Sequence, residues 1–363
     1  MRRSAGDRKI LSWRRVWLAL ALIAGGSALW PAGAAEARAC PASVYSELRS
    51  PAGAMADPVE IVCDLTLGPK DVVARPIAFS GAKASGITLD CRGGTLGTSD
   101  MTISYRRPTV LIRSLKGDGG RWSAPRNITV KNCTIIGNLR LVGLGLNGQA
   151  EPVRLSSLKP GHTARAQAAA PTAIVLDNLV FIARGTLPLY LGPGVTRVTV
   201  NGSRFEGDTT ATALYLDAES AENRITGNRF AVKTTRREQI AIDGSAGNVI
   251  SGNVFEGAVN GGIFLYRNAG EGGTIRHQSP QYNRIEGNRF LYDALIRPRP
   301  AIWLNQRNGR TTHRFSAPDL PLGSGLDPRD FAKFNVVRDN RILGGWKGLI
   351  RNTDPTNEIV GND

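Results

Sequence analysis

The phrase NRITGNRF decides the fold, and it occurs three times, at residues 223–230, as NVISGNVF at 248–255 and as NRIEGNRF at 283–290. Looser copies of the phrase end at Phe205, Ile342 and Asp363. From Phe205, its final aromatic residue returns after 25 residues, after another 25, and then after 35. Repeats of roughly 20–50 residues are the signature of a solenoid, whose units bury their apolar sides by stacking on one another.

The phrase favours strands over helices, because it is short and rich in Asn, Gly and β-branched residues. Asn and Gly accept the left-handed backbone conformation that a tight corner needs. Ile225, Ile250 and Ile285 recur in register with the phenylalanines, as strand residues facing one core would. A second short strand is expected in each period, at 213–217, 240–243, 263–267, 302–305 and 349–352. With no room for a crossover helix, this pattern predicts a parallel β-helix whose equivalent strands stack about 4.8 Å apart.

From about Gly86 onward, the chain resembles the right-handed parallel β-helix repeat proteins of the pectin-lyase-like superfamily. The resemblance implies an all-β, right-handed, single-stranded parallel β-helix with an N-terminal cap and long loops on one face. It does not fix a reaction. The DD and GHG signatures of the β-helix polygalacturonases, the DPHD-type motif of the alginate epimerases and the WxDH phrase of the pectate lyases are absent.

Residues 1–37 are expected to be an export signal peptide, because a positive segment precedes a short apolar run and small-residue cleavage sites. The apolar run falls short of the ~20 residues that a membrane span needs. We therefore expect a periplasmic or secreted protein with no stable membrane insertion after cleavage, and the choice between the Sec and Tat routes stays open. Residues 38–85 show no clear repeat and are assigned to the cap, and residues 86–363 to the β-helix repeat domain.

The chain is strongly basic, with a formal charge of +16 over 363 residues. Residues 1–35 contribute a net +5, so the rest of the chain keeps about +11. Such a charge on an exported protein favours an acidic partner, although an arginine-rich composition is also common in proteins of GC-rich genomes. Because no nucleic-acid-binding module is visible, we expect an acidic polysaccharide rather than nucleic acid, bound by a monomer.

The four cysteines all precede residue 134, and an even number in an exported protein suggests disulfides. Three pairings are possible, and free buried thiols are an alternative. We expect Cys40–Cys63 to tie down the cap and Cys91–Cys133 to join adjacent coils.

Two segments interrupt the repeat. Residues 106–121 are rich in arginine and glycine and are interpreted as a solvated loop or, alternatively, as a substrate-contacting arm. Residues 143–170 contain Pro152, Pro160 and an alanine-rich run, and are predicted to be a long surface loop with one helical turn. Long loops on a rigid scaffold often carry function.

The second strands predict a binding face. Alternation directs residues such as Leu214 and Leu216 inward. One outward column then contains Tyr215, Ala241, Phe264 and Trp303. The next contains Asp217, Asp243, Tyr266 with neighbouring Arg267, and Asn305. We expect an exposed aromatic strip beside a polar strip, which suits sugar rings and their hydroxyl and carboxylate groups.

Insertions after two of these strands are expected to form walls beside this face. They carry the residues Asn268, Arg276, His277, Arg307, Arg310, His313 and Arg314. Lys233, Arg236 and Arg237 precede the strand that begins at Ile240. The alternative for each residue alone is structural, because Asp often caps a turn, aromatic rings can be buried under loops and a histidine can be an ordinary surface residue.

The preferred function is β-elimination or C5 epimerisation on a uronate-containing polysaccharide, without a cofactor. Arg267, Arg237 or Lys233 would bind the carboxylate, and His277 or Tyr266 would act as base or acid. The expected substrate-binding residues are Tyr215, Asp217, Asp243, Phe264, Asn268, Trp303, Asn305 and Arg307. One alternative is a glycoside hydrolase that uses Asp217 and Asp243, which are also a possible calcium site. Another is a non-catalytic glycan-binding or scaffold protein.

Overall fold

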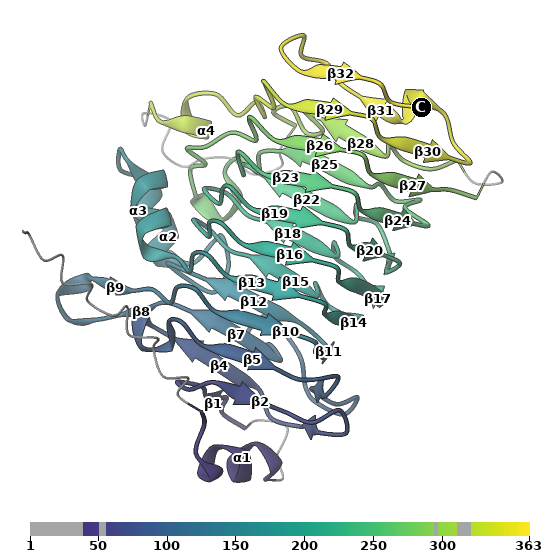
Figure 1. The fold of residues 1–363 in the computed structure, drawn as a ribbon. Helices are drawn as coiled ribbons and strands as arrows, with labels where there is room; N and C mark the ends of the chain where they lie inside the picture. Colours follow the sequence, from purple (N-terminus) through teal and green to yellow (C-terminus); the bar gives the residue numbers. More distant parts are fainter. Residues whose placement is uncertain (1–38, 51–55, 294–296, 311–320) are drawn as a thin grey trace, which may run out of the picture. The chain divides into compact units, whose positions relative to one another are not determined.

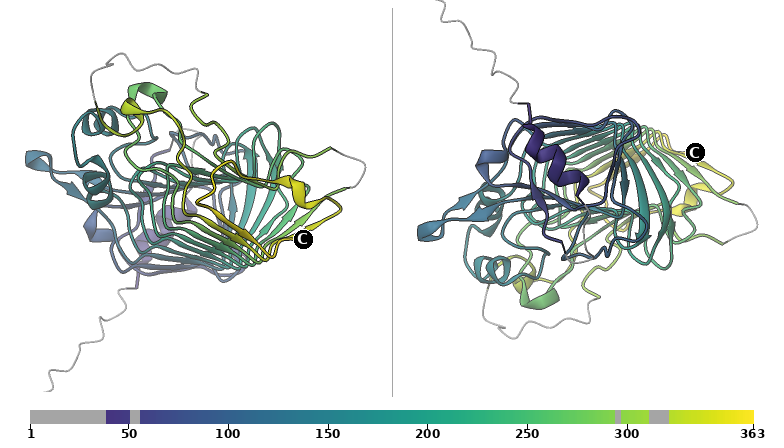
Figure 2. Two further views of the ribbon diagram at one scale, coloured as in Figure 1. Left: turned by 90° about the horizontal axis from the view of Figure 1, so that it is seen from above. Right: turned by 90° about the horizontal axis from the view of Figure 1, so that it is seen from below.

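The computed structural model describes residues 39–50, 56–293, 297–310 and 321–363. The predicted signal segment lies outside these residues. The described chain winds through three long parallel sheets, and neighbours within each sheet come from successive coils (Figure 1). Viewed along the stack, successive coils superimpose (Figure 2). The fold is therefore the all-β parallel β-helix that the repeated phrase predicts.

Each coil contributes one strand to the first and second sheets, and every coil but the last contributes one to the third. The first sheet consists of β1 (Val59–Glu60), β4 (Ile77–Ser80), β7 (Val110–Arg113), β12 (Leu139–Val142), β15 (Leu189–Leu191), β18 (Leu214–Leu216), β22 (Ile240–Asp243), β25 (Ile263–Tyr266), β28 (Ile302–Leu304) and β31 (Ile350–Arg351). The second consists of β2 (Leu65–Thr66), β5 (Thr88–Asp90), β10 (Thr129–Lys131), β13 (Val175–Asp177), β16 (Thr199–Asn201), β19 (Arg224–Thr226), β23 (Val249–Ser251), β26 (Arg284–Glu286), β29 (Val336–Arg338) and β32 (Glu358–Val360). The third consists of β3 (Val72–Val73), β6 (Thr95–Leu96), β11 (Thr134–Ile136), β14 (Val180–Gly185), β17 (Arg204–Thr209), β20 (Arg229–Phe230), β24 (Val254–Glu256), β27 (Arg289–Leu291) and β30 (Arg341–Leu343), with β21 (Lys233–Thr234) beside β17.

The repeated phrase builds the corner between the second and third sheets. In NRITGNRF, Ile225 points into the core from the second sheet and Phe230 from the third. Gly227 lies between them at a φ of 65°, where a side chain would be strained. Phe181, Phe205, Phe230, Phe255 and Phe290 stack with ring centroids 4.5–4.9 Å apart. The phrase thus supplies a corner and two core columns in every copy.

The two asparagines of the phrase form ladders that run along the stack. One contains Asn223, Asn248, Asn283, Asn335 and Asn357, and the other contains Asn228, Asn253, Asn288, Asn340 and Asn362. Within a ladder, each side-chain oxygen accepts hydrogen bonds from the backbone and the side chain of the asparagine one coil earlier. The buried amides are therefore paired at every step.

The N-terminal region contains more of the stack than its weak repeat suggested. Helix α1 (Ala42–Arg49) packs Leu48 into the core at the first coil, as a cap would. The stack itself begins with β1, and residues 59–66 hold two strands, β1 and β2, separated by a corner. The expected disulfides Cys40–Cys63 and Cys91–Cys133 are both present, and the second joins adjacent coils.

Long loops leave the ends of the first-sheet strands, as expected. The loop after β7 holds the hairpin β8 (Leu115–Lys116) and β9 (Trp122–Ser123). The segment 143–170 holds two helices rather than one turn, α2 (Glu151–Ser157) and α3 (His162–Ala169). The loop after β28 holds α4 (Gly323–Leu326). Within the described ranges, no helix is long and apolar enough to cross a membrane.

Candidate functional site

The outer face of the first sheet carries a column of large side chains in register. Paired positions place Arg140, Tyr190 and Tyr215 side by side on β12, β15 and β18. The column continues through Ala241, Phe264 and Trp303 as predicted. Leu214 and Leu216 face the core and are fully buried, which confirms the predicted alternation.

A cleft of about 560 Å³ lies over β12, β15 and β18. Its floor is the outward column, and its walls are loops from several coils. The lining residues are Ser104, Tyr105, Arg140, Asn147, Gly148, Gln149, Gly185, Thr186, Leu187, Tyr190, Thr210, Ala211, Thr212, Tyr215, Asp217, Arg237, Asn268, Glu271, Arg276 and Arg307. Four arginines thus line one cleft, together with three tyrosines and two carboxylates.

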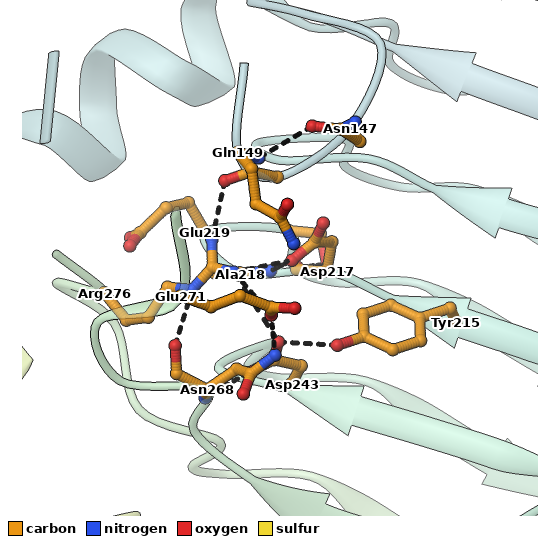
Figure 3. Close-up of polar contacts among 12 residues, drawn as sticks. Asn147, Gln149, Tyr215, Asp217, Ala218, Glu219, Asp243, Asn268, Glu271 and Arg276 are labelled. Atoms are coloured by element: carbon orange, nitrogen blue, oxygen red, sulfur yellow. Dashed lines mark hydrogen bonds and ion pairs between the residues drawn. The ribbon is translucent and has the colours of Figure 1, made fainter. Parts of the chain in front are cut away.

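Arg276 lies at the centre of the charged groups and is only 2% exposed. Its Nη2 atom is 3.8 Å from Oδ1 of Asp217, 3.9 Å from Oδ2 of Asp243 and 3.9 Å from Oε2 of Glu271 (Figure 3). Its Nη1 atom donates a hydrogen bond to the carbonyl oxygen of Gly148 at 3.2 Å. One guanidinium therefore holds three carboxylates and connects the loop after β25 with the loop after β12.

Gly148 is required where its loop crosses the carboxylate. A Cβ atom at this position would lie 2.5 Å from Oδ2 of Asp217. A side chain here would therefore displace either the loop or the carboxylate.

Two tyrosine–aspartate pairs lie beside Arg276. Tyr190 donates its hydroxyl hydrogen to Oδ2 of Asp217, and Tyr215 donates to Oδ2 of Asp243 at 2.7 Å. Burial, together with the neighbouring aspartates, raises the pKa of both tyrosines well above 10. Both hydroxyls therefore stay protonated at neutral pH and can act as proton donors.

Asp217 is a carboxyl group of the cleft whose pKa lies close to neutral. Burial raises its pKa to about 6, with Arg276 opposing the rise and Asp243 adding to it. The hydrogen bond from Tyr190 and one from the backbone N–H of Ala218, at 2.8 Å, also oppose the rise. A group with such a pKa is available both as a base and as an acid close to neutral pH.

Arg140 is buried but not fully paired. Its Nη1 atom donates to the carbonyl oxygen of Leu146 at 3.2 Å, and its guanidinium lies 4.7 Å from the centre of the Tyr190 ring. Its Nε atom is buried and has no hydrogen-bond partner among the described residues. Burial lowers the pKa of Arg140, but an arginine remains charged at any physiological pH.

Of the residues expected to be catalytic, Arg237 alone lines the cleft, where it bonds to Glu238 and donates to the hydroxyl of Tyr266 at 2.6 Å. Tyr266 is only 1% exposed and lies beneath Arg307. Lys233 is exposed on β21, outside the lining.

Arg267 and His277 hold loops in place, away from the cleft lining. Arg267 is buried, and its guanidinium donates to the carbonyl oxygens of Asp327 and Arg329. Nε2 of His277 lies 2.7 Å from the carbonyl oxygen of Ser157 in α2. These contacts are structural, so neither side chain is carried into the mechanism below.

The expected exposed strip is largely covered, which corrects the sequence interpretation. Phe264 and Asp243 are fully buried and Asn305 is 8% exposed, because the loops after β25 and β28 fold over them. Trp303 stays partly exposed, with Arg351 stacked on its ring, and does not line the cleft. Asp217, Tyr215, Asn268 and Arg307 do line it. His313 and Arg314 lie outside the described residues.

The suggested calcium site is occupied by a side chain. Arg276 lies within 4 Å of both Asp217 and Asp243. Across the described ranges, no group of three or more His, Cys, Asp or Glu side chains is placed to hold a metal ion. Calcium is therefore not used in the mechanism below.

Sequence reasoning missed Arg140, Tyr190, Tyr105 and Glu271 as site residues, and named Arg276 only as a loop cation. A signal was present for the first two. The strands LRLV (β12) and LYL (β15) alternate in the same way as the later strands of the first sheet, from which the outward columns were predicted. The missed residue of each strand is at the outward position. The others come from loops, where no periodicity places a side chain.

Comparisons with known proteins support the site little. No family model matches the chain, and no curated protein matches its sequence. The alginate lyase from Paenibacillus sp. str. FPU-7 is 12% identical, with 89% of this chain and 97% of that one covered and a TM-score of 0.34. The surface protein and adhesin PfbA of Streptococcus pneumoniae is 13% identical, with 82% and 79% covered and a TM-score of 0.35. At such similarity neither protein informs the reaction, so the fold rests on the strand pairing and the site on its own residues.

Proposed function

We propose that the cleft binds a uronate-containing polysaccharide and removes the C5 proton of a bound uronate, leading to β-elimination or C5 epimerisation. One observation carries the proposal: four arginines and three tyrosines line the same cleft as Asp217, whose pKa is about 6. Arginines match carboxylates in geometry and charge, and tyrosine rings stack on sugars. The charge of about +11 on the chain beyond residue 35 also favours an anionic polymer.

Arg140 is assigned to the uronate carboxylate. Loss of the C5 proton places negative charge on that carboxylate, so a fixed cation beside it lowers the barrier. Arg140 lines the cleft, and among the described residues its guanidinium makes one hydrogen bond, from Nη1 to the carbonyl oxygen of Leu146, and no ion pair. Its charge is therefore available to a bound carboxylate, and hydrogen bonds between ionised partners are roughly twice as strong as neutral ones.

Asp217 is assigned as the base. Above pH 6 its carboxylate is ionised, and its burial leaves it poorly solvated and therefore more basic than an exposed aspartate. Arg276 and the hydroxyl of Tyr190 fix its orientation. The C5–H bond breaks, and the proton moves to Asp217.

Tyr215 is assigned as the acid. In elimination the C4–O4 bond breaks, a double bond forms between C4 and C5, and the departing O4 takes the proton of the Tyr215 hydroxyl. In epimerisation the same hydroxyl returns a proton to the opposite face of C5. In both cases the phenolate then regains a proton from solvent, and Asp217 releases the proton that it took from C5. The two outcomes therefore share their first step and their residues.

The two disulfides agree with an oxidising compartment. We accordingly place the protein and its substrate outside the cytoplasm, and expect it to work as a monomer because the cleft is complete within one chain.

The test is a screen of uronate polymers in D₂O, in which three readouts separate the outcomes. Deuterium at C5 reports epimerisation or reversible exchange, because the elimination product keeps no hydrogen at C5. Ultraviolet absorbance reports that unsaturated product, and reducing ends report chain cleavage. We expect Asp217→Asn to lower the rate by about 10²–10⁴-fold, and Arg140→Ala by at least about 10²-fold. The matched control is Arg289→Ala, which removes an exposed arginine from the third sheet. The wild-type rate should rise with pH through about 6 as Asp217 ionises.

Other outcomes would redirect the proposal. Reducing ends without deuterium or absorbance would indicate hydrolysis, for which Asp217 and Glu271 both line the cleft. Binding without any of the three signals would indicate a non-catalytic glycan-binding protein. A wild-type rate unchanged in Asp217→Asn would remove Asp217 from the mechanism.

A further inference from the structure

A row of alternating arginine side chains and aromatic rings leads out of the cleft toward the N-terminal end of the stack. The guanidinium of Arg140 lies 4.7 Å from the centre of the Tyr190 ring and 6.0 Å from that of Tyr105. On Tyr105, a second guanidinium, from Arg106, lies 5.3 Å from the ring centre. Tyr105 is 42% exposed. The series continues on the cleft side through Tyr215, whose ring centre is 6.1 Å from that of Tyr190.

This row of cations and rings ends at a second hollow of about 450 Å³. Its lining contains Ala56, Asp57, Pro58, Pro76, Arg106, Arg107, Pro108, Leu111, Arg113 and Leu146. The two hollows are immediate neighbours. Leu111 on β7 is paired with Arg140 on β12, and Arg106 and Leu146 each adjoin a cleft residue in sequence.

The second hollow contains more arginines than acidic residues. Arg113 is paired with Glu60 at 2.9 Å. Arg106 and Arg107 have no ion pair within the described part of the chain, and Asp57 is the acidic residue of the lining. A partly apolar floor with two unpaired guanidinium groups suits a sugar ring that bears a carboxylate.

We propose that this hollow is a second subsite for the same acidic polysaccharide, which then runs along the first sheet from Tyr215 past Tyr105 to Arg106 and Arg107. This inference rests on the proposed function of the cleft. From β18 to β7 the path crosses three strand spacings of about 4.8 Å each. Short oligomers therefore fill the cleft alone, whereas longer chains reach both subsites and bind more tightly.

The test is a series of uronate oligomers of increasing length, assayed for affinity by calorimetry and for turnover with the three readouts above. In the wild type, affinity should rise stepwise once the chain spans both hollows. The double variant Arg106→Ala/Arg107→Ala should lose that step, with about tenfold or more weaker binding of long chains. Short oligomers should keep their affinity and kcat, since neither arginine is among the residues that line the cleft.

The matched control is Arg289→Ala/Arg341→Ala, which removes two exposed arginines paired across β27 and β30. It lowers the net charge equally, so any loss that it shares with the first variant reflects general charge attraction. If the length-dependent step survives in Arg106→Ala/Arg107→Ala, the subsite is refuted while the cleft function stands. If the wild type binds no uronate oligomer of any length, both proposals are refuted together.

Discussion

The asparagine ladders and the cleft both bury polar side chains, but they do so in opposite ways. In the ladders, Asn253 receives hydrogen bonds from Asn228 and gives them to Asn288, so every amide meets an identical neighbour one coil away. In the cleft, Arg276 meets three carboxylates that come from different coils and loops. The first arrangement is neutral and repeated, and the second is charged and occurs once.

The asparagine amides stabilise the fold, whereas the buried charges of the cleft carry a desolvation cost. Neutral amides are inexpensive to bury when each donor and acceptor is satisfied. Buried charges lose hydration that their mutual attraction often fails to recover, so a well-packed apolar substitute is frequently as stable. A buried ionic cluster beside a cleft is therefore a candidate functional site.

The largest expected effect comes from breaking the cleft cluster. Arg276→Ala leaves Asp217, Asp243 and Glu271 without their shared cation, which should lower the free energy of unfolding by about 3–5 kcal/mol. The readout is the urea or guanidinium denaturation midpoint. Arg289→Ala, which removes an exposed arginine, should change stability by less than about 0.5 kcal/mol. Equal stability of wild type and Arg276→Ala would mean that the carboxylates need no partner, and the contrast with the ladders would fail.

A smaller effect is expected from interrupting a ladder. Asn253→Ala removes the acceptor of Asn228 and a donor to the carbonyl oxygen of Ile225, in a site that is fully buried. One or two orphaned groups should cost about 2–3 kcal/mol in denaturation experiments. Turnover should be unchanged, because the ladder lies at the corner between the second and third sheets.

The exposed asparagine at position 201 provides the control for this prediction. Its side chain bonds to Asp177 at the surface, where water can replace the contact. Asn201→Ala should therefore cost less than about 0.5 kcal/mol. A similar loss for both asparagines would show that burial in the ladder is not what makes Asn253 important.

The fold could be predicted from the sequence because one phrase specifies the corner, the core positions and the asparagine ladders at once. In NRITGNRF, Gly227 sets the corner, Ile225 and Phe230 set the core, and Asn223 and Asn228 set the ladders. Each choice agrees with the others in every copy, and that consistency is what makes a fold predictable. The first-sheet strand at 240–243 and the direction of its side chains followed from the same register.

The cleft could be predicted only in part. The alternation of inward and outward residues along a strand shows which face of the sheet a side chain occupies, but not which loops cover that face. Phe264 and Tyr266 lie at the predicted positions but under loops, so they are buried instead of exposed. Arg276 and Glu271 reach the site from a loop with no periodic pattern. Their positions depend on tertiary contacts, such as the bond from Arg276 to the carbonyl oxygen of Gly148, that span more than a hundred residues.

The finest distinction between the two regions is their response to pH. Burial raises the pKa of Asp217 and of Asp330 to about 6, against an ordinary value of 3.8, whereas the ladders contain no group that titrates. At pH 5 the folded protein therefore binds protons that the unfolded chain does not. These two groups therefore favour the folded state more as the pH falls from 7, and their contribution levels off near pH 4, where the unfolded carboxyl groups also protonate. His162 acts in the opposite direction, because burial lowers its pKa from 6.5 to about 3 and only the unfolded chain takes up its proton between pH 7 and pH 5.

The expected contribution of each aspartate between pH 7 and pH 5 is about 1 kcal/mol in favour of folding at the lower pH. Comparing denaturation midpoints of wild type and variants at the two pH values isolates the contribution of Asp217, because His162 titrates equally in all of them. Asp217→Asn cannot titrate at this position, so its change in stability from pH 7 to pH 5 should be about 1 kcal/mol less favourable than that of the wild type. Asn253→Ala should be less stable at both pH values but show the wild-type change. If Asp217→Asn showed the wild-type change as well, Asp217 would have an ordinary pKa in the folded protein. Burial of the charged cluster would then cost no more than burial of the amides. The assignment of Asp217 as the base would also lose its physical basis.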